Sequence, residues 1–403
     1  WLAELDDLGS LSKTELIAGQ TSNNDNLISV FQPIWITNDH LAVSEDKNGW
    51  WNVMIADTTK NKNQENYWGR FWPIEAEAAM PQWLLGMSAI GSTGKEIIAA
   101  ICNKGSWEIV LLKKDYSVTS INQPFDDLSG LDINNHRLVA IASNSYTESG
   151  LLELNLNDKN FEHTSFSNIV IPKEEISQSK PFWFKGFQGK LTHAWYYPPI
   201  NQDRKIPPLL VKSHSGPTGM ARRGLNLEIQ FWTSRGWSVL DVNYGGSTGF
   251  GREYRERIKN NWGEIDVFDC TAAANSLVAE GKADPELIAI DGSSAGGFTT
   301  LACLCFTDVF RVAACRYAVS DLTLFSNETH RFEEGYLEYL IGNKYEIFSR
   351  YSERSPINNI ESINCPVIFF QGLKDKVVSP GQTERISSKL RKNNIPVEVY
   401  MFE

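Results

Sequence analysis

One serine in a short glycine-rich turn has the clearest chemical pattern in this sequence. The stretch Leu287–Phe298 runs from an apolar strand through Gly-Ser-Ser-Ala-Gly into an apolar helix. In such a strand–turn–helix the central serine stands clear of the sheet. Glycines two positions before and after it let strand and helix pack closely. Ser294 has Gly292 and Gly296 at those positions, whereas Ser293 does not. We therefore predict that Ser294 is a nucleophile.

A nucleophilic serine also needs a base and a carboxylate that orients the base. In hydrolases built on this turn, the carboxylate follows a later strand of the same sheet. Asp375 lies in a Gly-Leu-Lys-Asp-Lys loop directly after the apolar stretch Pro366–Gln371. A solvated loop is the alternative for this segment, but its position after Ser294 makes Asp375 our predicted orienting residue.

Two backbone N–H groups are expected to form an oxyanion hole. The first belongs to Ala295, which directly follows the predicted nucleophile. The second should come from the loop after an earlier strand, and Gly216 lies in the loop His214-Ser-Gly-Pro after the apolar strand Pro208–Lys212. We expect His214 itself to be structural.

A histidine base is missing from the expected place. The triad order is serine, acid, histidine, and none of the six histidines follows Asp375. They are His40, His136, His163, His193, His214 and His330. His330 lies on an insert between the fifth and sixth strands, the wrong place for the base. The chain stops at Glu403 on the strand after which that histidine belongs, so we expect the gene to continue and to place a histidine within about ten residues.

The elements that must position these residues alternate between strand and helix from about residue 171 onward. Such alternation is typical of a doubly wound, mostly parallel sheet, here an α/β hydrolase. The expected strands are Thr192–Tyr197, Pro208–His214, Trp237–Tyr244, Leu287–Gly292, Arg311–Val319, Pro366–Gln371 and Pro396–Phe402. The expected helices lie near Arg222–Arg235, Val267–Glu280, Phe298–Phe306 and Gly381–Lys392.

The first 170 residues are rich in strand patterns that repeat. Gly49–Asp57, Gly105–Leu112 and Gly150–Leu156 are similar strands, each preceded by a turn and another strand. A repeat of about 45 to 55 residues suits the blades of a β-propeller, and Phe31–Trp35 and Met80–Trp83 are expected as loops at blade entrances. We predict a partial propeller over residues 1–170 and a catalytic domain over residues 171–403. Because so few blades would leave sheet edges open, we expect the natural chain to begin before Trp1.

Composition narrows the partners. A net charge of −11 disfavours nucleic acid and anionic membrane surfaces. No apolar run approaches the roughly 18 residues of a membrane span. None of the six cysteines forms a C-x-x-C pair, so we expect buried thiols in a reducing cytoplasm, no metal and no cofactor. The glycine-rich loop Asn243–Gly251 matches neither phosphate-binding pattern, which argues against a nucleotide. Assembly into a homo-oligomer is left open.

Taken together, the motifs resemble those of the prolyl oligopeptidase family, most closely its acylaminoacyl-peptidase and dipeptidyl-peptidase-like members. They are His214-Ser-Gly-Pro, Asn243-Tyr-Gly-Gly-Ser-Thr-Gly-Phe-Gly, Gly292-Ser-Ser-Ala-Gly-Gly, Ser355-Pro-Ile-Asn and Gln371-Gly-Leu-Lys-Asp-Lys-Val-Val. The resemblance implies a serine peptidase whose propeller admits short peptides. It assigns Ser294 as nucleophile, Asp375 as orienting acid, and Gly216 with Ala295 as oxyanion hole. The family usually has His-Gly-Gly-Pro where this chain has Ser215, and its Gly-x-x-His-Gly segment is missing here.

Three functions fit these observations. The leading one is a serine peptidase that hydrolyses short peptides through an acyl-enzyme. An esterase on the same fold is the first alternative, because a triad does not choose between amide and ester. A non-catalytic binding protein built from propeller and hydrolase parts is the second.

Overall fold

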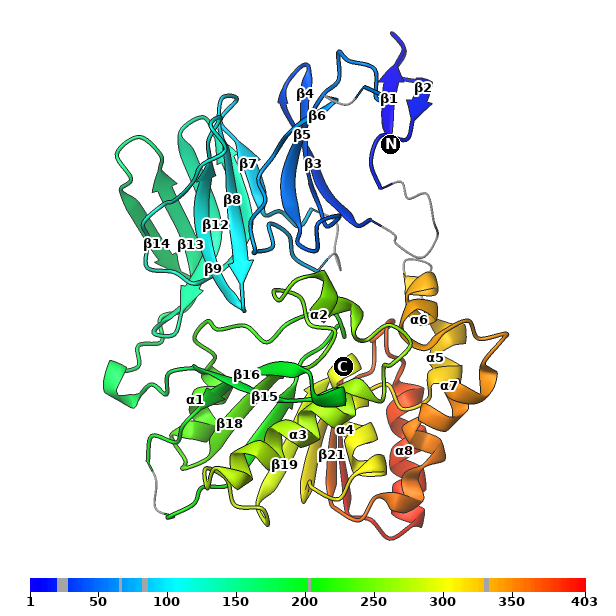
Figure 1. The fold of residues 1–403 in the computed structure, drawn as a ribbon. Helices are drawn as coiled ribbons and strands as arrows, with labels where there is room; N and C mark the ends of the chain where they lie inside the picture. The colour runs from blue at the N-terminus through cyan, green and yellow to red at the C-terminus, as the bar shows by residue number, and fades with distance from the viewer. Residues whose placement is uncertain (20–27, 65–66, 82–85, 202–203, 330–332) are drawn as a thin grey trace. The chain divides into compact units, whose positions relative to one another are not determined.

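The computed structural model (Figure 1) describes residues 1–19, 28–64, 67–81, 86–201, 204–329 and 333–403. The chain divides into two compact units. Unit 1 comprises residues 1–168 and 249–253, and unit 2 comprises residues 169–248 and 254–403. Each is described by itself below.

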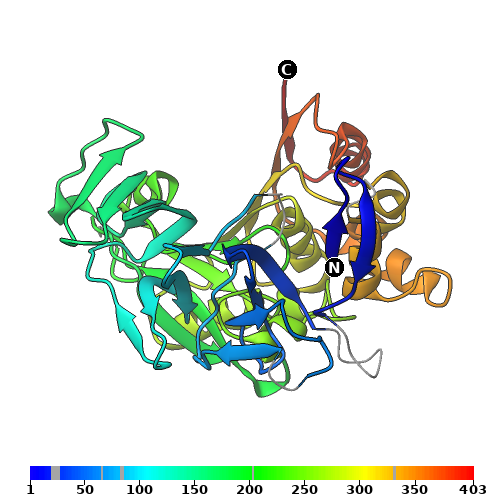
Figure 2. The same cartoon turned by 90° about the horizontal axis from the view of Figure 1, so that it is seen from above.

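In its described part, unit 1 consists of antiparallel sheets that follow one another along the chain, coloured from blue to green in Figure 2. A two-stranded sheet pairs β1 (Leu2–Leu5) with β2 (Leu11–Glu15). Three four-stranded sheets then follow, each adding its strands in chain order, as propeller blades do. Their strands are β3 (Val30–Thr37), β4 (His40–Glu45), β5 (Asn52–Asp57), β6 (Trp68–Phe71), β7 (Ile90–Ser92), β8 (Ile97–Asn103), β9 (Ser106–Leu112), β10 (Val118–Ser120), β11 (Asp127–Asn134), β12 (Arg137–Asn144), β13 (Thr147–Asn155) and β14 (Phe161–Ser165).

One segment expected as a loop is a strand. Phe31–Trp35 forms most of β3, which pairs with β4 through a register shift between Phe31 and Ile34. Gln32 has a φ of 47° in this bulge. Its side chain accepts hydrogen bonds from the N–H groups of Ala89 and Ile90. The proline that suggested a loop is therefore accommodated at a bulge, where a strand tolerates it.

The second expected loop, Met80–Trp83, extends into residues 82–85, which lie outside the described residues. Its first residue, Met80, is buried.

Unit 2 is organised around an eight-stranded sheet with the order β15-β16-β18-β17-β19-β20-β21-β22. Strands β15 and β16 pair antiparallel, as do β16 and β18, and every later neighbour is parallel. The strands are β15 (Lys180–Lys185), β16 (Leu191–Tyr197), β17 (Leu209–Ser213), β18 (Ser238–Asn243), β19 (Ile288–Ser293), β20 (Val312–Arg316), β21 (Val367–Gly372) and β22 (Val397–Phe402). This confirms the predicted fold class, an α/β hydrolase preceded by a partial propeller.

Helices cover both faces of the sheet. Helices α3, α4 and α8 contribute to one large apolar core, while α1 packs with Trp195 and Val239 in a separate cluster. The helices are α1 (Leu227–Thr233), α2 (Arg252–Glu256), α3 (Ile265–Ala279), α4 (Ala295–Phe306), α5 (Leu322–Glu328), α6 (Glu334–Ile341), α7 (Phe348–Arg354) and α8 (Pro380–Lys392). Short 3₁₀ turns occupy Lys173–Glu175, Phe187–Gly189, Pro356–Asn358 and Ile360–Ser362.

Strand β15 was not predicted. It lies in a segment that looked like a linker because of its charged neighbours, yet Phe182 and Phe184 alternate with the exposed residues Pro181, Trp183 and Lys185. The two phenylalanines are buried in the core of unit 2, and the strand pairs with β16 along its whole length. A period of two with apolar residues on one side is typical of an edge strand.

Among the described residues, no helix is both long and apolar enough to cross a membrane. All six cysteines are buried and none is in a disulfide.

Candidate active site

The loops that carry the predicted site residues leave the sheet at the same edge. Ser213 at the end of β17 pairs with Gly292 of β19, and Ser293 pairs with Arg316 at the end of β20. Strand β21 continues the parallel series and ends at Gly372. Since carboxyl ends of parallel strands share one edge, the loops after β17, β19 and β21 emerge together, where open α/β sheets bind ligands.

Ser294 lies on a strained turn between β19 and α4. Its backbone has a φ of 53° and a ψ of −119°, outside the regions favoured by residues with a side chain. Its N–H donates to the carbonyl oxygen of Arg316 at 2.9 Å, and its own carbonyl accepts from Phe298 at 3.0 Å. Ala295 is the first residue of α4, where backbone N–H groups have no acceptor within the helix.

Both glycines of the turn are required by crowding. A Cβ added at Gly292 would overlap the carbonyl group of Gly296 and the hydroxyl of Ser213. A Cβ added at Gly296 would overlap the carbonyl oxygens of Ser213 and His214. The Gly-x-Ser-x-Gly pattern thus reflects a direct approach of α4 to the end of β17.

Gly216 lies in a loop that is fastened at several points. The residue has a φ of 131°, which only glycine adopts readily. The hydroxyl of Tyr244 donates to the carbonyl oxygen of His214 at 2.8 Å, and the two rings stack with centroids 4.2 Å apart. Further along, the hydroxyl of Tyr336 lies 2.7 Å from that of Thr218. These bonds fix the backbone on both sides of the predicted oxyanion donor.

Ser215 joins this loop to the nucleophile turn. Its hydroxyl donates to the carbonyl oxygen of Ser293 at 2.7 Å. The serine that stands where the family usually has glycine therefore makes a bond that glycine cannot make. The structure brings Gly216 and the turn of Ser294 and Ala295 together through this contact.

His214 has the surroundings of a structural residue. Its Nδ1 lies 2.9 Å from the carbonyl oxygen of Ser215, and its Nε2 lies 2.7 Å from the hydroxyl of Ser247. Burial lowers the pKa of the imidazole to about 4. A neutral ring with both nitrogens engaged is a poor general base near neutral pH.

Asp375 is half-buried in a largely exposed turn after β21. Its Oδ1 accepts from the N–H groups of Val377 at 2.9 Å and Val378 at 3.0 Å. Gln371 at the end of the strand donates to the carbonyl oxygen of Val378 and accepts from Thr383 of α8. The loop is thereby tied to the strand before it and the helix after it.

Strand β20 separates the strand that leads to Ser294 from the strand that leads to Asp375. With strands about 4.8 Å apart, the two loops start roughly 10 Å from one another, a gap that an imidazole could bridge. Of the chain's histidines, His193 and His214 are described in unit 2, and His330 lies outside the described residues. His193 is fully buried between Trp183 and Trp195, and burial lowers its pKa to about 3.

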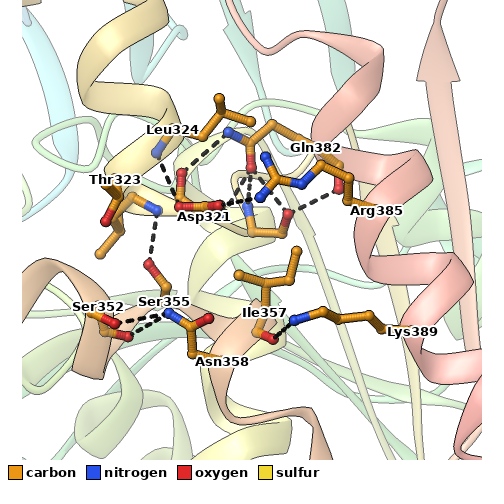
Figure 3. A network of polar contacts seen from close by, with 12 residues as sticks. Asp321, Thr323, Leu324, Ser352, Ser355, Ile357, Asn358, Gln382, Arg385 and Lys389 are labelled. Atoms are coloured by element: carbon orange, nitrogen blue, oxygen red, sulfur yellow. Dashed lines mark hydrogen bonds and ion pairs between the residues drawn. The ribbon is translucent and has the colours of Figure 1, made fainter.

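The Ser355-Pro-Ile-Asn motif has a structural role (Figure 3). The hydroxyl of Ser355 accepts from the N–H of Leu322 at 2.9 Å, and Gln382 of α8 accepts from the N–H of Asp321 at 2.8 Å. Arg385 adds an ion pair to Asp321 at 2.8 Å. This network joins α8 to the segment after β20.

The glycine-rich stretch after β18 is held by a buried carboxylate. Asp269 of α3 accepts from the N–H of Gly245 and from that of Phe187, both at 2.7 Å. Burial raises the pKa of Asp269 to about 6, although these bonds lower it. N–H groups already used in this way are not offered to a phosphate. Among the described residues, no group of three or more His, Cys, Asp or Glu side chains could hold a metal ion.

Sequence reasoning missed a set of charged residues beside the turn: Lys212, Glu228, Asp291 and Arg316. Asp291 is 2% exposed and bonds to both cations. The one local sign of this set in the sequence was Asp291, a charged residue in an otherwise apolar strand three residues before Ser294.

An open, mostly parallel sheet with a serine on a strained strand-to-helix turn at its carboxyl edge defines an α/β hydrolase. The chain matches the model of the prolyl oligopeptidase family over residues 223–403. The resemblance predicted from the motifs is confirmed.

Solved structures extend the likeness to the whole chain. A Mycobacterium tuberculosis puromycin-hydrolyzing peptidase aligns with a TM-score of 0.92 and 32% identity, over 100% of this chain and 61% of that one. A puromycin hydrolase aligns with a TM-score of 0.91 and 30% identity, over 100% and 60%.

A curated relative is the acylamino-acid-releasing enzyme of Arabidopsis thaliana, 29% identical over 50% of this chain and 27% of that protein. The chain thus spans about three fifths of the two structures, and the match covers about a quarter of the plant enzyme.

Proposed function

We propose that this protein is a serine peptidase that hydrolyses short peptides through an acyl-enzyme on Ser294. The observation that carries the proposal is the strained turn of Ser294 at the carboxyl ends of the parallel strands. The two glycines of this turn are required because strand and helix pack closely there. Asp375 orients the base, and the N–H groups of Gly216 and Ala295 form the oxyanion hole. The match of residues 223–403 to the prolyl oligopeptidase family supports these roles.

In the first half-reaction, the Oγ of Ser294 attacks the carbonyl carbon of the scissile amide while a general base takes the hydroxyl proton. The oxyanion that forms accepts hydrogen bonds from Gly216 and Ala295. The amine leaves with the proton returned by the base. Water then attacks the acyl-enzyme, its proton passes through the same base to Oγ, and the carboxylic acid is released.

The names of the relatives favour amides over esters as substrates. Those 30–32% identical over the whole chain are named for hydrolysing puromycin, and the curated relatives are named peptidases and acylamino-acid-releasing enzymes. We propose short peptides and related small amides as substrates. We assign residues 1–170 to a partial propeller and residues 171–403 to the catalytic domain. Six buried, unbridged cysteines support the reducing cytoplasm as the location.

The test uses the protein as its gene encodes it. It is treated with a fluorophosphonate, and peptide mapping locates the adduct. We expect it on Ser294, lost in Ser294→Ala and retained in Ser293→Ala, the matched control. An adduct on Ser293, or no adduct on the folded protein, would overturn the proposal.

A second assay compares puromycin, free and acetylated aminoacyl nitroanilides, and matched nitrophenyl esters. Amide turnover that disappears in Ser294→Ala supports a peptidase. Turnover of the esters alone would favour the esterase.

A further inference from the structure

Four charged side chains close a ring beside the nucleophile turn. We call Lys212, Glu228, Asp291 and Arg316 the charge ring. The Nζ of Lys212 lies 2.9 Å from Asp291 and 3.2 Å from Glu228, and the guanidinium of Arg316 lies 2.7 Å from Glu228. Arg316 also pairs with Asp291 through its other terminal nitrogen. Each cation thus touches both anions, and the formal charge of the ring is zero.

The ring is largely removed from water on the sheet side. The side chain of Asp291 is 2% exposed and that of Lys212 is 14% exposed, whereas Glu228 on α1 is 40% exposed. Burial raises the pKa of the Asp291 carboxyl, but Lys212 and Arg316 lower it more, so its pKa lies below the usual value. Burial lowers the pKa of Lys212, but Asp291 and Glu228 outweigh it, so its pKa is raised. Asp291 and Lys212 are therefore both ionised near neutral pH.

Arg316 connects this ring directly to the nucleophile. Its backbone carbonyl oxygen accepts the N–H of Ser294 at 2.9 Å, while its side chain is held by Asp291 and Glu228. The next residue, Tyr317, has a φ of 38° and donates its N–H to Phe370 of β21 at 2.8 Å. The carbonyl group of Arg316 thus contacts two residues with a left-handed backbone. It accepts the N–H of Ser294, and Tyr317 follows it directly in the chain.

Left-handed conformations of residues with side chains cost about 1–3 kcal/mol each and persist only where the surroundings fix them. Replacing a buried ion pair with well-packed apolar residues often leaves the stability of a protein unchanged. A gain in stability therefore does not by itself explain the charge ring. We infer that the charge ring holds the end of β20 in place and thereby fixes the turn of Ser294. This inference rests on the proposed function. Arg316 is a positioning residue for the nucleophile, and Asp291 and Glu228 act through it.

The experiment uses side-chain substitutions, because these leave the backbone carbonyl oxygen of residue 316 in place. Arg316→Gln removes both ion pairs, and Arg316→Lys keeps the charge but loses the planar fork. Arg385→Gln is the matched control, because Arg385 makes a partly exposed ion pair to Asp321 in the same unit. The readouts are kcat, KM and the rate constant for fluorophosphonate modification of Ser294.

We expect Arg316→Gln to lower kcat and the modification rate about 10- to 100-fold, since a displacement of the reacting atom on the order of 1 Å can cost a hundredfold. KM should change less than about twofold, because groups that bind substrate are untouched. Arg316→Lys should recover part of the loss, and Arg385→Gln should react at the wild-type rate. A modification rate for Arg316→Gln equal to that of Arg385→Gln would overturn the inference.

If Arg316→Gln does not fold, Glu228→Gln loosens the ring from its exposed side. This variant should slow modification about threefold, in line with a lost exposed ion pair of under 1 kcal/mol. An unchanged rate would contradict the inference.

Hydrogen exchange of the Ser294 amide provides a readout independent of catalysis. Faster exchange in the ring variants than in Arg385→Gln would support the positioning role. A wild-type protein that fails to react with the probe would refute the proposed function but not this role. Unchanged exchange would refute the ring's role.

Discussion

The loop after β19 and the loop after β21 are built on different principles, although both end parallel strands at the same edge. The Ser294 turn has a left-handed backbone, two crowded glycines and bonds to β20 and to the loop of Ser215. The Asp375 loop relies mainly on bonds within itself and to its own strand and helix, with one bond from the N–H of Leu373 to the carbonyl oxygen of Phe402 in β22. A neighbouring strand and a neighbouring loop thus fix the predicted nucleophile, while mostly local bonds fix the predicted orienting acid.

The largest expected difference between the two loops is chemical. Ser294→Ala should lower kcat about a millionfold, whereas Asp375→Asn should lower it about ten-thousandfold, the order of effects measured in subtilisin. The reason is that, in the proposed mechanism, the serine forms the covalent bond, whereas the acid only orients the base. Steady-state kinetics on the protein that the gene encodes measures both, and equal losses would contradict the assignment of Asp375.

The next difference concerns stability. Gly296→Ala should lower the free energy of unfolding by about 3 kcal/mol, because its Cβ would overlap the backbone of Ser213 and His214. Gly372→Ala, at the end of β21, should change it by less than about 0.5 kcal/mol, because its Cβ would meet no atom within 4 Å. Urea unfolding measures both values. A well-tolerated Gly296→Ala would show that α4 can move away from β17.

An electrostatic difference of intermediate size is expected from Asp241, which pairs in register with Lys212. Burial raises the pKa of Asp241 to about 7, although Lys212 lowers it. Between about pH 4 and pH 7 the folded protein binds a proton that the unfolded chain has lost, so this residue's contribution to stability decreases as pH rises.

Asp241→Asn removes that dependence. The gain in unfolding free energy over wild type should be about 2 kcal/mol larger at pH 8 than at pH 5. The full pKa difference implies roughly 4 kcal/mol, of which about 2.6 kcal/mol falls between these two pH values, and relaxation of the site reduces it further. Unfolding at the two pH values checks this, and a difference that does not change with pH would refute it.

The smallest effect is expected from the bond that joins two loops. Ser215→Ala removes the hydrogen bond to the carbonyl oxygen of Ser293, worth about 1 kcal/mol. We expect a reduction of kcat of about fivefold with little change in KM. Thr218→Val, which removes a hydroxyl from the same loop, is the comparison, and a larger effect there would place the main support of the loop elsewhere.

The turn of Ser294 could be predicted because strand, glycine spacing and helix are contiguous in the sequence. The sheet could also be predicted, since its seven central and C-terminal strands are apolar runs. The edge strand β15 was missed because four of its six residues are exposed and made it look like a linker. Phe31–Trp35 was wrongly expected as a loop, because a proline at a bulge and a proline in a loop look alike in sequence.

The charge ring was beyond sequence reasoning for another reason. Its members come from three strands and a helix, and only the strand order β17-β19-β20 places them together. The roles of Ser294, Asp375, Gly216 and Ala295 and the position of the base stay predictions. The structure brings the loops of Gly216, Ser294 and Ala295 into contact, and it places Asp375 two strands away.

The strand order of unit 2 also bears on when the protein could become reactive during its synthesis. From β19 onward, each new strand is added to the same growing edge of the sheet in the order in which it is translated. The N–H of Ser294 finds its acceptor on Arg316, which belongs to the next strand. At about 5–20 residues per second, Arg316 is translated about one to four seconds after Ser294. We therefore expect the strained geometry of Ser294 to form only after the following strand, β20, has docked.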